Sequence, residues 1–112
     1  MALVHGRLHG SDAAPSTGEQ IHRLAEMGSV VVDQILSGRL EGPVDYRQDT
    51  DEWVLVLEGS ATLVVDGRRM HLGTGDWVLL PAGTAHSLIE TQMGTSWLTV
   101  TAPASSPTAV TS

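Results

Sequence analysis

The fold is decided by the stretch Gly75-Asp76-Trp77-Val78-Leu79-Leu80-Pro81-Ala82-Gly83-Thr84-Ala85-His86, which reads G-x5-P-x-G-x2-H. Gly75 turns the chain before a strand, Pro81 ends the hydrogen-bond ladder of that strand, and Gly83 permits a tight reversal. His86 opens the next strand, and we expect its imidazole to face the interior. The spacing therefore predicts two strands around a turn, with one histidine directed inward.

A second informative stretch begins at Glu52, which stands at the head of an apolar strand that ends before Gly59. Because an isolated charge is unfavourable among apolar side chains, the Glu52 carboxylate must be paired, hydrated or bound to a metal. An ion pair with Arg47 is the structural alternative. Glu52 is thus a candidate site residue whose role depends on what it meets in the interior.

The rest of the chain from residue 30 onward reads as antiparallel strands. Short β-branched runs alternate with breaks rich in Gly, Asp and Pro, and this regular spacing is typical of a sandwich or barrel. We expect hairpins at Glu58-Gly59-Ser60 and at Asp66-Gly67, because these residues tolerate positive φ. The predicted strands span residues 30–37, 45–48, 53–58, 61–66, 69–72, 76–80, 84–90 and 95–101.

The region before these strands predicts one short amphipathic helix over 16–28. Ser16 and Glu19 fit a capping box, apolar residues follow at helical spacing, and Gly28 is placed to end the helix. The sequence before and after lacks periodicity and has little to bury. The predicted organisation is a flexible segment over 1–15, one domain over 16–101 and a disordered tail over 102–112.

Charge and composition exclude several classes of function. Thirteen acidic residues against six basic ones give a net charge of −7, which disfavours nucleic acid and anionic membrane surfaces as partners. The chain has no cysteine, so a metal would be held by imidazole, carboxylate, carboxamide or phenol groups. No secretion signal or apolar run of about 18 residues is present, and we expect a cytoplasmic location.

The stretch from Gly75 to His86 resembles the second sequence motif of the cupin superfamily at each fixed position. Glu52 and Gly59 keep the end of the first cupin motif, G-x5-H-x-H-x3-4-E-x6-G, and Trp53 resembles the residue that follows the glutamate in a small bacterial single-domain group. The resemblance implies an all-β fold, a small antiparallel jelly-roll β-barrel, here with one short N-terminal helix. It also implies a cavity for a small molecule inside the barrel.

Both histidines of the first motif are absent, since no histidine occurs between residues 40 and 70. One register places Tyr46 and Gln48 at the two positions, and the other places Asp45 and Arg47 there. We favour the first register, because positions 46, 48 and 52 share parity on a regular strand. The choice matters because an arginine cannot be a metal ligand.

The resemblance implies a metal-dependent enzyme of the dioxygenase, isomerase or decarboxylase type. Its divalent ion, Fe, Mn, Ni or Zn, would be held by Gln48, Glu52 and His86, and the catalytic residues would be Tyr46, Glu52 and His86. One alternative is a metal-free cupin that binds a small ligand or uses these residues as acid and base. Another is a structural or regulatory barrel filled by side chains. A homodimer formed through a sheet edge or face is expected.

Overall fold

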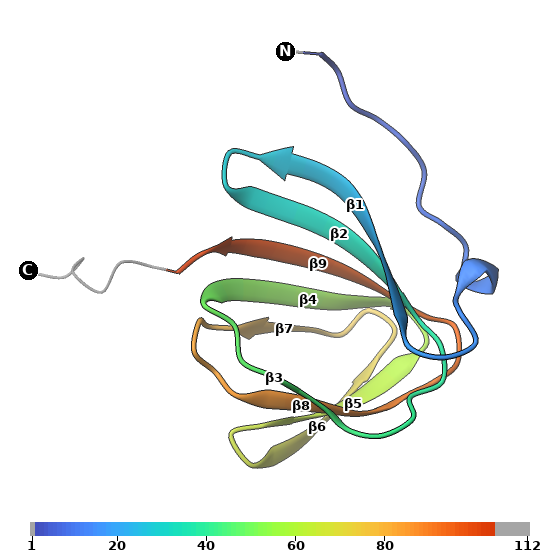
Figure 1. The fold of residues 1–112 in the computed structure, drawn as a ribbon, viewed down its shortest axis with the longest axis vertical. Helices are drawn as coiled ribbons and strands as arrows, with labels where there is room; N and C mark the ends of the chain where they lie inside the picture. The colour runs from blue at the N-terminus through green and yellow to red at the C-terminus, as the bar shows by residue number, and fades with distance from the viewer. Residues whose placement is uncertain (1, 105–112) are drawn as a thin grey trace, which may run out of the picture.

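The computed structural model describes residues 2–104, which form two antiparallel sheets and one turn of 3-10 helix, η1 (Figure 1). The larger sheet has the strand order β1-β2-β9-β4-β7, and the smaller has the order β3-β8-β5-β6. The elements are η1 (Ser11–Ala13), β1 (Glu19–Met27), β2 (Val30–Ser37), β3 (Val44–Tyr46), β4 (Thr50–Glu58), β5 (Ser60–Val65), β6 (Arg68–Gly73), β7 (Trp77–Leu80), β8 (His86–Thr91) and β9 (Thr95–Pro103).

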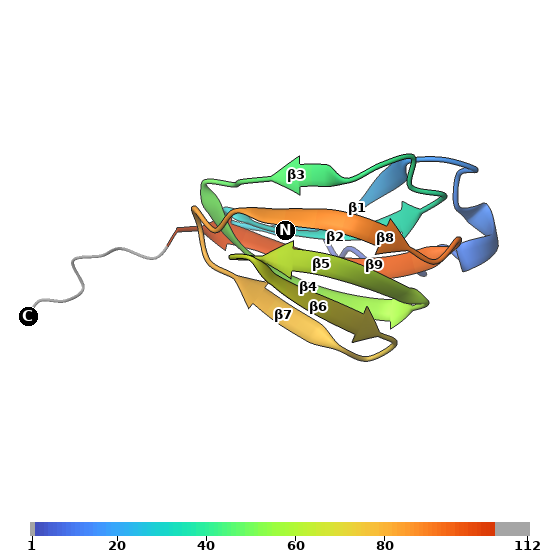
Figure 2. The same cartoon turned by 90° about the horizontal axis from the view of Figure 1, so that it is seen from below.

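The two sheets face each other as a sandwich and enclose the core (Figure 2). Alternate residues of each strand point inward, so β4 contributes Val54 and Val56 while β8 contributes Leu88 from the opposite side. Trp97 of β9 is the largest core side chain and is 5% exposed. The predicted all-β fold is confirmed, and the eight predicted strands agree with β2 to β9 to within three residues at every end.

The predicted helix over 16–28 is wrong, because residues Glu19–Met27 form strand β1. This strand pairs with β2 as a hairpin around Gly28, whose φ of 62° suits the turn. A bulge between Arg23 and Ala25 interrupts the alternation of β1. Because of the extra residue, apolar residues in this segment lie three and four positions apart instead of two. This is the spacing of residues on one face of a helix.

The two predicted hairpins have different outcomes. Asp66 and Gly67, with φ of 49° and 78°, close the hairpin between β5 and β6 as predicted. Gly59 does not close a hairpin, because β4 and β5 belong to different sheets. It carries the chain from one sheet to the other at a φ of 98°, and a Cβ there would lie 2.5 Å from Thr95 Oγ1. Glycine is therefore required at position 59 for two reasons, the positive φ and the lack of room for a Cβ atom.

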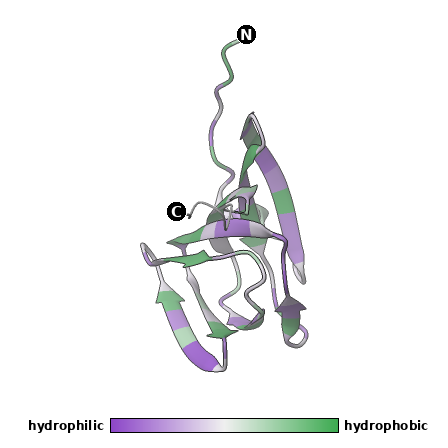
Figure 3. Cartoon of the chain, turned by 90° about the vertical axis from the view of Figure 1, so that its left-hand side faces the viewer, coloured by the Kyte–Doolittle hydropathy of each residue, from purple (hydrophilic) through white to green (hydrophobic). Residues whose placement is uncertain are grey.

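The N-terminal segment crosses the outer surface of the larger sheet and then runs clear of it (Figure 3). The side chain of Gln34, which is 1% exposed, accepts a hydrogen bond from the His9 N–H and donates one to the His9 carbonyl. Residues 102 and 103 of the predicted tail belong to β9, and 105–112 lie outside the described residues. No helix in the described part of the chain has the length and apolar content that a membrane span requires.

Candidate functional site

The stretch from Gly75 to His86 forms a turn that fixes the two halves of the site relative to each other. Gly83 N–H donates to the Gln48 carbonyl at 2.8 Å, and Ala82 N–H donates to Asp51 Oδ1 at 2.8 Å. Pro81 ends β7 and Gly83 turns with a φ of 82°, so that β8 starts in the opposite sheet. His86 is thereby held at a fixed position relative to the segment that carries Gln48.

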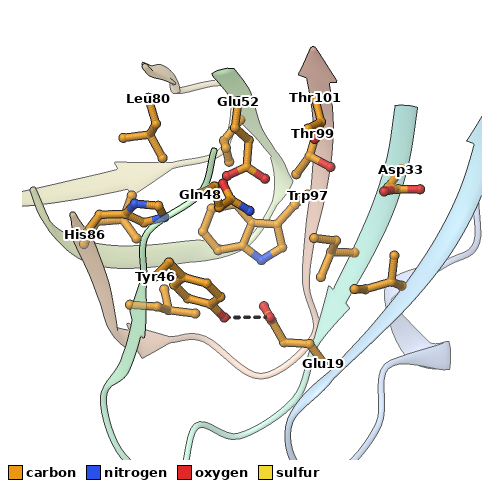
Figure 4. Close-up of a pocket in the computed structure, with 15 residues that line it drawn as sticks. Glu19, Asp33, Tyr46, Gln48, Glu52, Leu80, His86, Trp97, Thr99 and Thr101 are labelled. Atoms are coloured by element: carbon orange, nitrogen blue, oxygen red, sulfur yellow. Dashed lines mark hydrogen bonds between the residues drawn. The ribbon is translucent and has the colours of Figure 1, made fainter. Parts of the chain in front are cut away.

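A cavity of about 230 Å³ opens between the sheets at this end of the sandwich. Each predicted site residue lines it: Tyr46 from β3, Gln48 from the following loop, Glu52 from β4 and His86 from β8 (Figure 4). The volume lies just below the range of about 300–1,000 Å³ that holds drug-sized ligands, so the cavity suits a small molecule.

The residues of the alternative register lie elsewhere. Asp45 and Arg47 border a second hollow on the surface, which Tyr46 and His86 also line, and they do not line the cavity between the sheets. Asp45 accepts a 2.6 Å hydrogen bond from Ser87 Oγ. The structure thus directs Tyr46 and Gln48 into the cavity. The parity argument for this register is incomplete, because Tyr46 and Glu52 lie on strands of different sheets.

His86 is positioned by its neighbours on both sides. It pairs with Tyr46 across the β3–β8 ladder, and the two rings stack at 5.3 Å between centroids and 16° between planes. Its Nδ1 lies 3.2 Å from the Thr84 carbonyl, which only accepts, so Nδ1 carries the hydrogen of this bond. In the neutral ring Nε2 therefore keeps its lone pair, the form in which histidine binds metals and accepts protons.

Glu19 is a site residue that the sequence did not reveal. Its carboxylate accepts a hydrogen bond from Tyr46 OH at 3.2 Å (Figure 4). It accepts another from Ser37 Oγ at 3.0 Å, and Trp97 Nε1 donates to Ser37 Oγ at 2.9 Å. These bonds join β1, β2, β3 and β9 at one side of the cavity. In the sequence, position 19 fits the capping box of the predicted helix, and no local signal relates it to Tyr46.

Tyr46 is a neutral hydrogen-bond donor in this arrangement. Burial, and next the negative charge of Glu19 with its hydrogen bond, raise the pKa of Tyr46 to about 12, with a further contribution from Glu52. The phenol is therefore protonated at neutral pH, and a phenolate ligand at this position is disfavoured. Its ring and hydroxyl instead line the cavity as an amphipathic surface.

Glu52 is the carboxylate with the least compensation at the site. Burial raises its pKa; the nearby His86 lowers it, and the charges of Glu19 and Asp33 raise it further. Asp33 is paired with Arg23 at 2.7 Å, whereas no lysine or arginine is among the residues that line the cavity. Among the described residues the cavity is thus lined by three carboxylates and one imidazole. It favours a cation or a neutral ligand over an anion.

The donor set suits a divalent ion only as a weak, open site. Glu52 and His86 are two strong donors, and the amide oxygen of Gln48 can supply a third. Residues 2–104 contain no group of three or more His, Cys, Asp or Glu side chains that could hold a metal. An ion at this position would therefore keep several coordination sites for water or substrate.

Comparison with known proteins connects the site to a family. Residues 31–101 match the family described as "Cupin domain". A putative mannose-6-phosphate isomerase from Ralstonia eutropha JMP134 has a similar fold, with a TM-score of 0.73 and 28% identity over 88% of this chain and 100% of that one.

Two curated relatives are also similar to parts of the chain. Quercetin 2,3-dioxygenase of Bacillus subtilis is 47% identical over 45 residues, which are 40% of this chain and 13% of the relative. Human 3-hydroxyanthranilate 3,4-dioxygenase is 33% identical over 78 residues, which are 70% of this chain and 27% of the relative. The matched regions thus span at most about a quarter of these two relatives.

Proposed function

The chain belongs to the cupin domain family, and from that premise we propose that it is a small-molecule enzyme with one divalent metal ion bound in its cavity. Glu52 and His86 hold the ion, and Gln48 completes the protein ligands. The observation that carries the proposal is that a largely buried carboxylate and an imidazole with a free Nε2 line one cavity, which no lysine or arginine lines. Similarity to two dioxygenases favours oxygen chemistry as the reaction class.

When bound, the ion would act as a Lewis acid and, if iron, as the site of dioxygen chemistry. The rest of the site binds and orients the substrate. The Tyr46 hydroxyl gives its hydrogen to Glu19 and presents its oxygen to the substrate as an acceptor, and the apolar side chains of the lining exclude water. The sugar phosphate implied by the name of the isomerase-like structure suits this cavity poorly, because three carboxylates repel a phosphate.

A metal-free cupin is the second candidate, and the raised pKa of Glu52 favours it. Burial makes the Glu52 carboxylate a stronger proton acceptor than a carboxylate in water, because its pKa is raised, and His86 in the same cavity can act as its partner. Ligand binding would then be insensitive to chelators. The remaining alternative, a structural or regulatory barrel filled by side chains, is not favoured, because the cavity opens at Glu52 and His86.

The test is metal binding, measured without any assumption about the substrate. Protein stripped with chelator is titrated with Zn²⁺, Mn²⁺ and Fe²⁺ by calorimetry, and the melting temperature is recorded for each. We expect one ion per chain, and we expect Glu52→Gln or His86→Ala to weaken binding at least about tenfold, because each removes one of two strong donors.

Matched controls are available on the surface. His71→Ala and Glu58→Gln remove an imidazole and a carboxylate that lie outside the cavity, and they should leave metal affinity unchanged. Saturable ligand binding by a protein that takes up none of these ions would replace the metal proposal with the metal-free one. Equal loss of metal binding in the control variants would show that the ion binds elsewhere.

A further inference from the structure

The β2 and β9 side of the cavity carries polar side chains that the proposed metal site does not use. Thr99 of β9 is paired with Asp33 of β2, so the two side chains lie next to each other on the inner face of the larger sheet, and both line the cavity (Figure 4). We name these two residues the distal subsite. Because β9 lies between β2 and β4, the strands that carry Asp33 and Glu52 are roughly 10 Å apart.

Thr99 has a hydroxyl group without a partner. The residue is 4% exposed. Within residues 2–104 no group lies within hydrogen-bond distance of its Oγ1, and this atom still reaches the open space of the cavity. Buried polar groups in proteins are normally hydrogen-bonded, because an unpaired one costs free energy. The Thr99 hydroxyl therefore indicates a ligand that bonds to it from inside the cavity.

The Asp33 carboxylate is only partly compensated. Its Oδ1 accepts a 2.7 Å hydrogen bond from Arg23 Nε, and 14% of its side chain is exposed. Arg23 does not line the cavity, and its Nη1 also binds Glu26 Oε1 at 2.8 Å. One guanidinium thus serves two carboxylates from outside the cavity, and Asp33 Oδ2 remains available to a ligand.

The charge of the lining favours a cationic ligand even when the metal site is filled. Glu19, Asp33 and Glu52 carry three negative charges, and no lysine or arginine is among the described residues that line the cavity. Burial raises the pKa of Glu52, His86 lowers it, and the charges of the other two carboxylates raise it further, so all three act on one space. A divalent ion would cancel two of the three charges. One negative charge then remains for the substrate to balance.

Hydrogen-bonding capacity favours an ammonium group over a neutral hydroxyl. Asp33 Oδ2 and the Glu19 carboxylate only accept hydrogen bonds, and the Tyr46 oxygen also accepts, because its hydrogen goes to Glu19. An ammonium group supplies three donors, and its bonds to carboxylates are charge-assisted, whereas a hydroxyl supplies one donor. Trp97, which is 5% exposed, lines the cavity beside Thr99 and adds an aromatic surface that attracts cations.

We propose that the substrate is a small protonated amine whose ammonium group binds at the distal subsite, Asp33 and Thr99. This assignment rests on the proposed function, which places the reacting end of the same molecule at Glu52 and His86. Apolar side chains of the lining, such as Val54, contact the body between the two ends. The cavity volume of about 230 Å³ limits this body to about one ring.

The test compares three molecules of similar shape and different charge, which are phenethylamine, 2-phenylethanol and phenylacetate. Calorimetry at pH 7 measures their binding to chelator-treated protein and, for the amine and the alcohol, to protein loaded with Zn²⁺. We expect phenethylamine to bind at least about tenfold more tightly than the alcohol in both forms, because its bonds are charge-assisted. Phenylacetate should bind most weakly to the metal-free form, because the carboxylates repel it.

Two variants locate the ammonium group. Asp33→Asn should weaken phenethylamine binding at least about tenfold and leave the affinity for 2-phenylethanol unchanged. Thr99→Val keeps the shape of the side chain and should weaken amine binding at least about threefold. Glu90→Gln is the matched control, because it changes the net charge equally at an exposed position outside the cavity and should leave all affinities unchanged. Circular dichroism shows whether each variant keeps its strands.

Each outcome bears on the amine subsite or on the metal proposal. Equal affinity for the three molecules would overturn the amine assignment, and so would an undiminished preference for the amine in both folded variants. Failure of phenethylamine and of the narrower butylamine to bind at millimolar concentration would overturn it as well. Amine binding by a protein that takes up no metal would contradict the proposed function alone, and metal binding without amine binding would contradict the amine subsite alone.

Discussion

The hydrogen bond between Glu19 and Tyr46 allows a direct solution test, because Tyr46 is the only tyrosine of the chain. Burial and the Glu19 carboxylate together raise its pKa to about 12 from an ordinary 10.0. Glu19→Gln removes the charge but not the burial, which is the larger cause. The pKa should therefore fall from about 12 and remain above 10.

The assay is the near-ultraviolet absorbance of tyrosinate, followed as pH is raised, with Tyr46→Phe as the baseline. The folded pKa is the raised one, so the contribution of Tyr46 to stability is present below pH 10 and is lost as pH rises through 12. A double-mutant cycle of Glu19→Gln and Tyr46→Phe should give a coupling of about 0.5–1.5 kcal/mol at neutral pH. An unchanged pKa in Glu19→Gln would refute the bond, and a pKa below 10 would refute the role of burial.

Three other predictions concern the cavity and the crossing between the sheets. Because the folded pKa of Glu52 is raised above 4.5, stability of the metal-free protein should decline as pH rises through that pKa, and urea titrations of Glu52→Gln should lack this decline. Gly59→Ala should destabilise the fold by about 2 kcal/mol or more, because a Cβ would collide with Thr95 at positive φ, whereas Gly42→Ala, in open space, should change little. Gln48→His should tighten Zn²⁺ binding at least about tenfold by adding a second imidazole, and calorimetry that detects no gain would show that position 48 does not face the ion.

Strands β2 to β9 were predictable because their signals are local. Turn residues such as Asp66 and Gly67 and the proline at position 81 mark where strands end, and no distant contact is needed to read them. The sheet to which each strand belongs cannot be read from local signals, because it depends on which strands pair. Gly59 looks the same in sequence whether it closes a hairpin or crosses between sheets, and only Thr95, far along the chain, distinguishes the two.

The sequence allowed part of the cavity lining to be predicted, but not the hydrogen bonds that connect it. Tyr46, Gln48, Glu52 and His86 could be named from motif spacing, and all of them line the cavity. Glu19 could not, because its role depends on β1 being a strand, and the bulge in β1 gave that segment a helical spacing. A bulge changes periodicity over a few residues only, so sequence patterns cannot separate it from a short helix.

The anchor between Gln34 and residue 9 has a consequence for how the chain tolerates change. The Gln34 amide binds both the N–H and the carbonyl of that residue, as a neighbouring peptide group in a strand would. These two bonds involve only the backbone of residue 9, but its side chain contributes as well, because the His9 ring stacks on His22 of β1 with 3.8 Å between the ring centroids. The leading segment is therefore attached in two ways, by the buried Gln34 amide, which binds backbone whatever the side chain, and by a ring contact that requires a planar side chain at position 9.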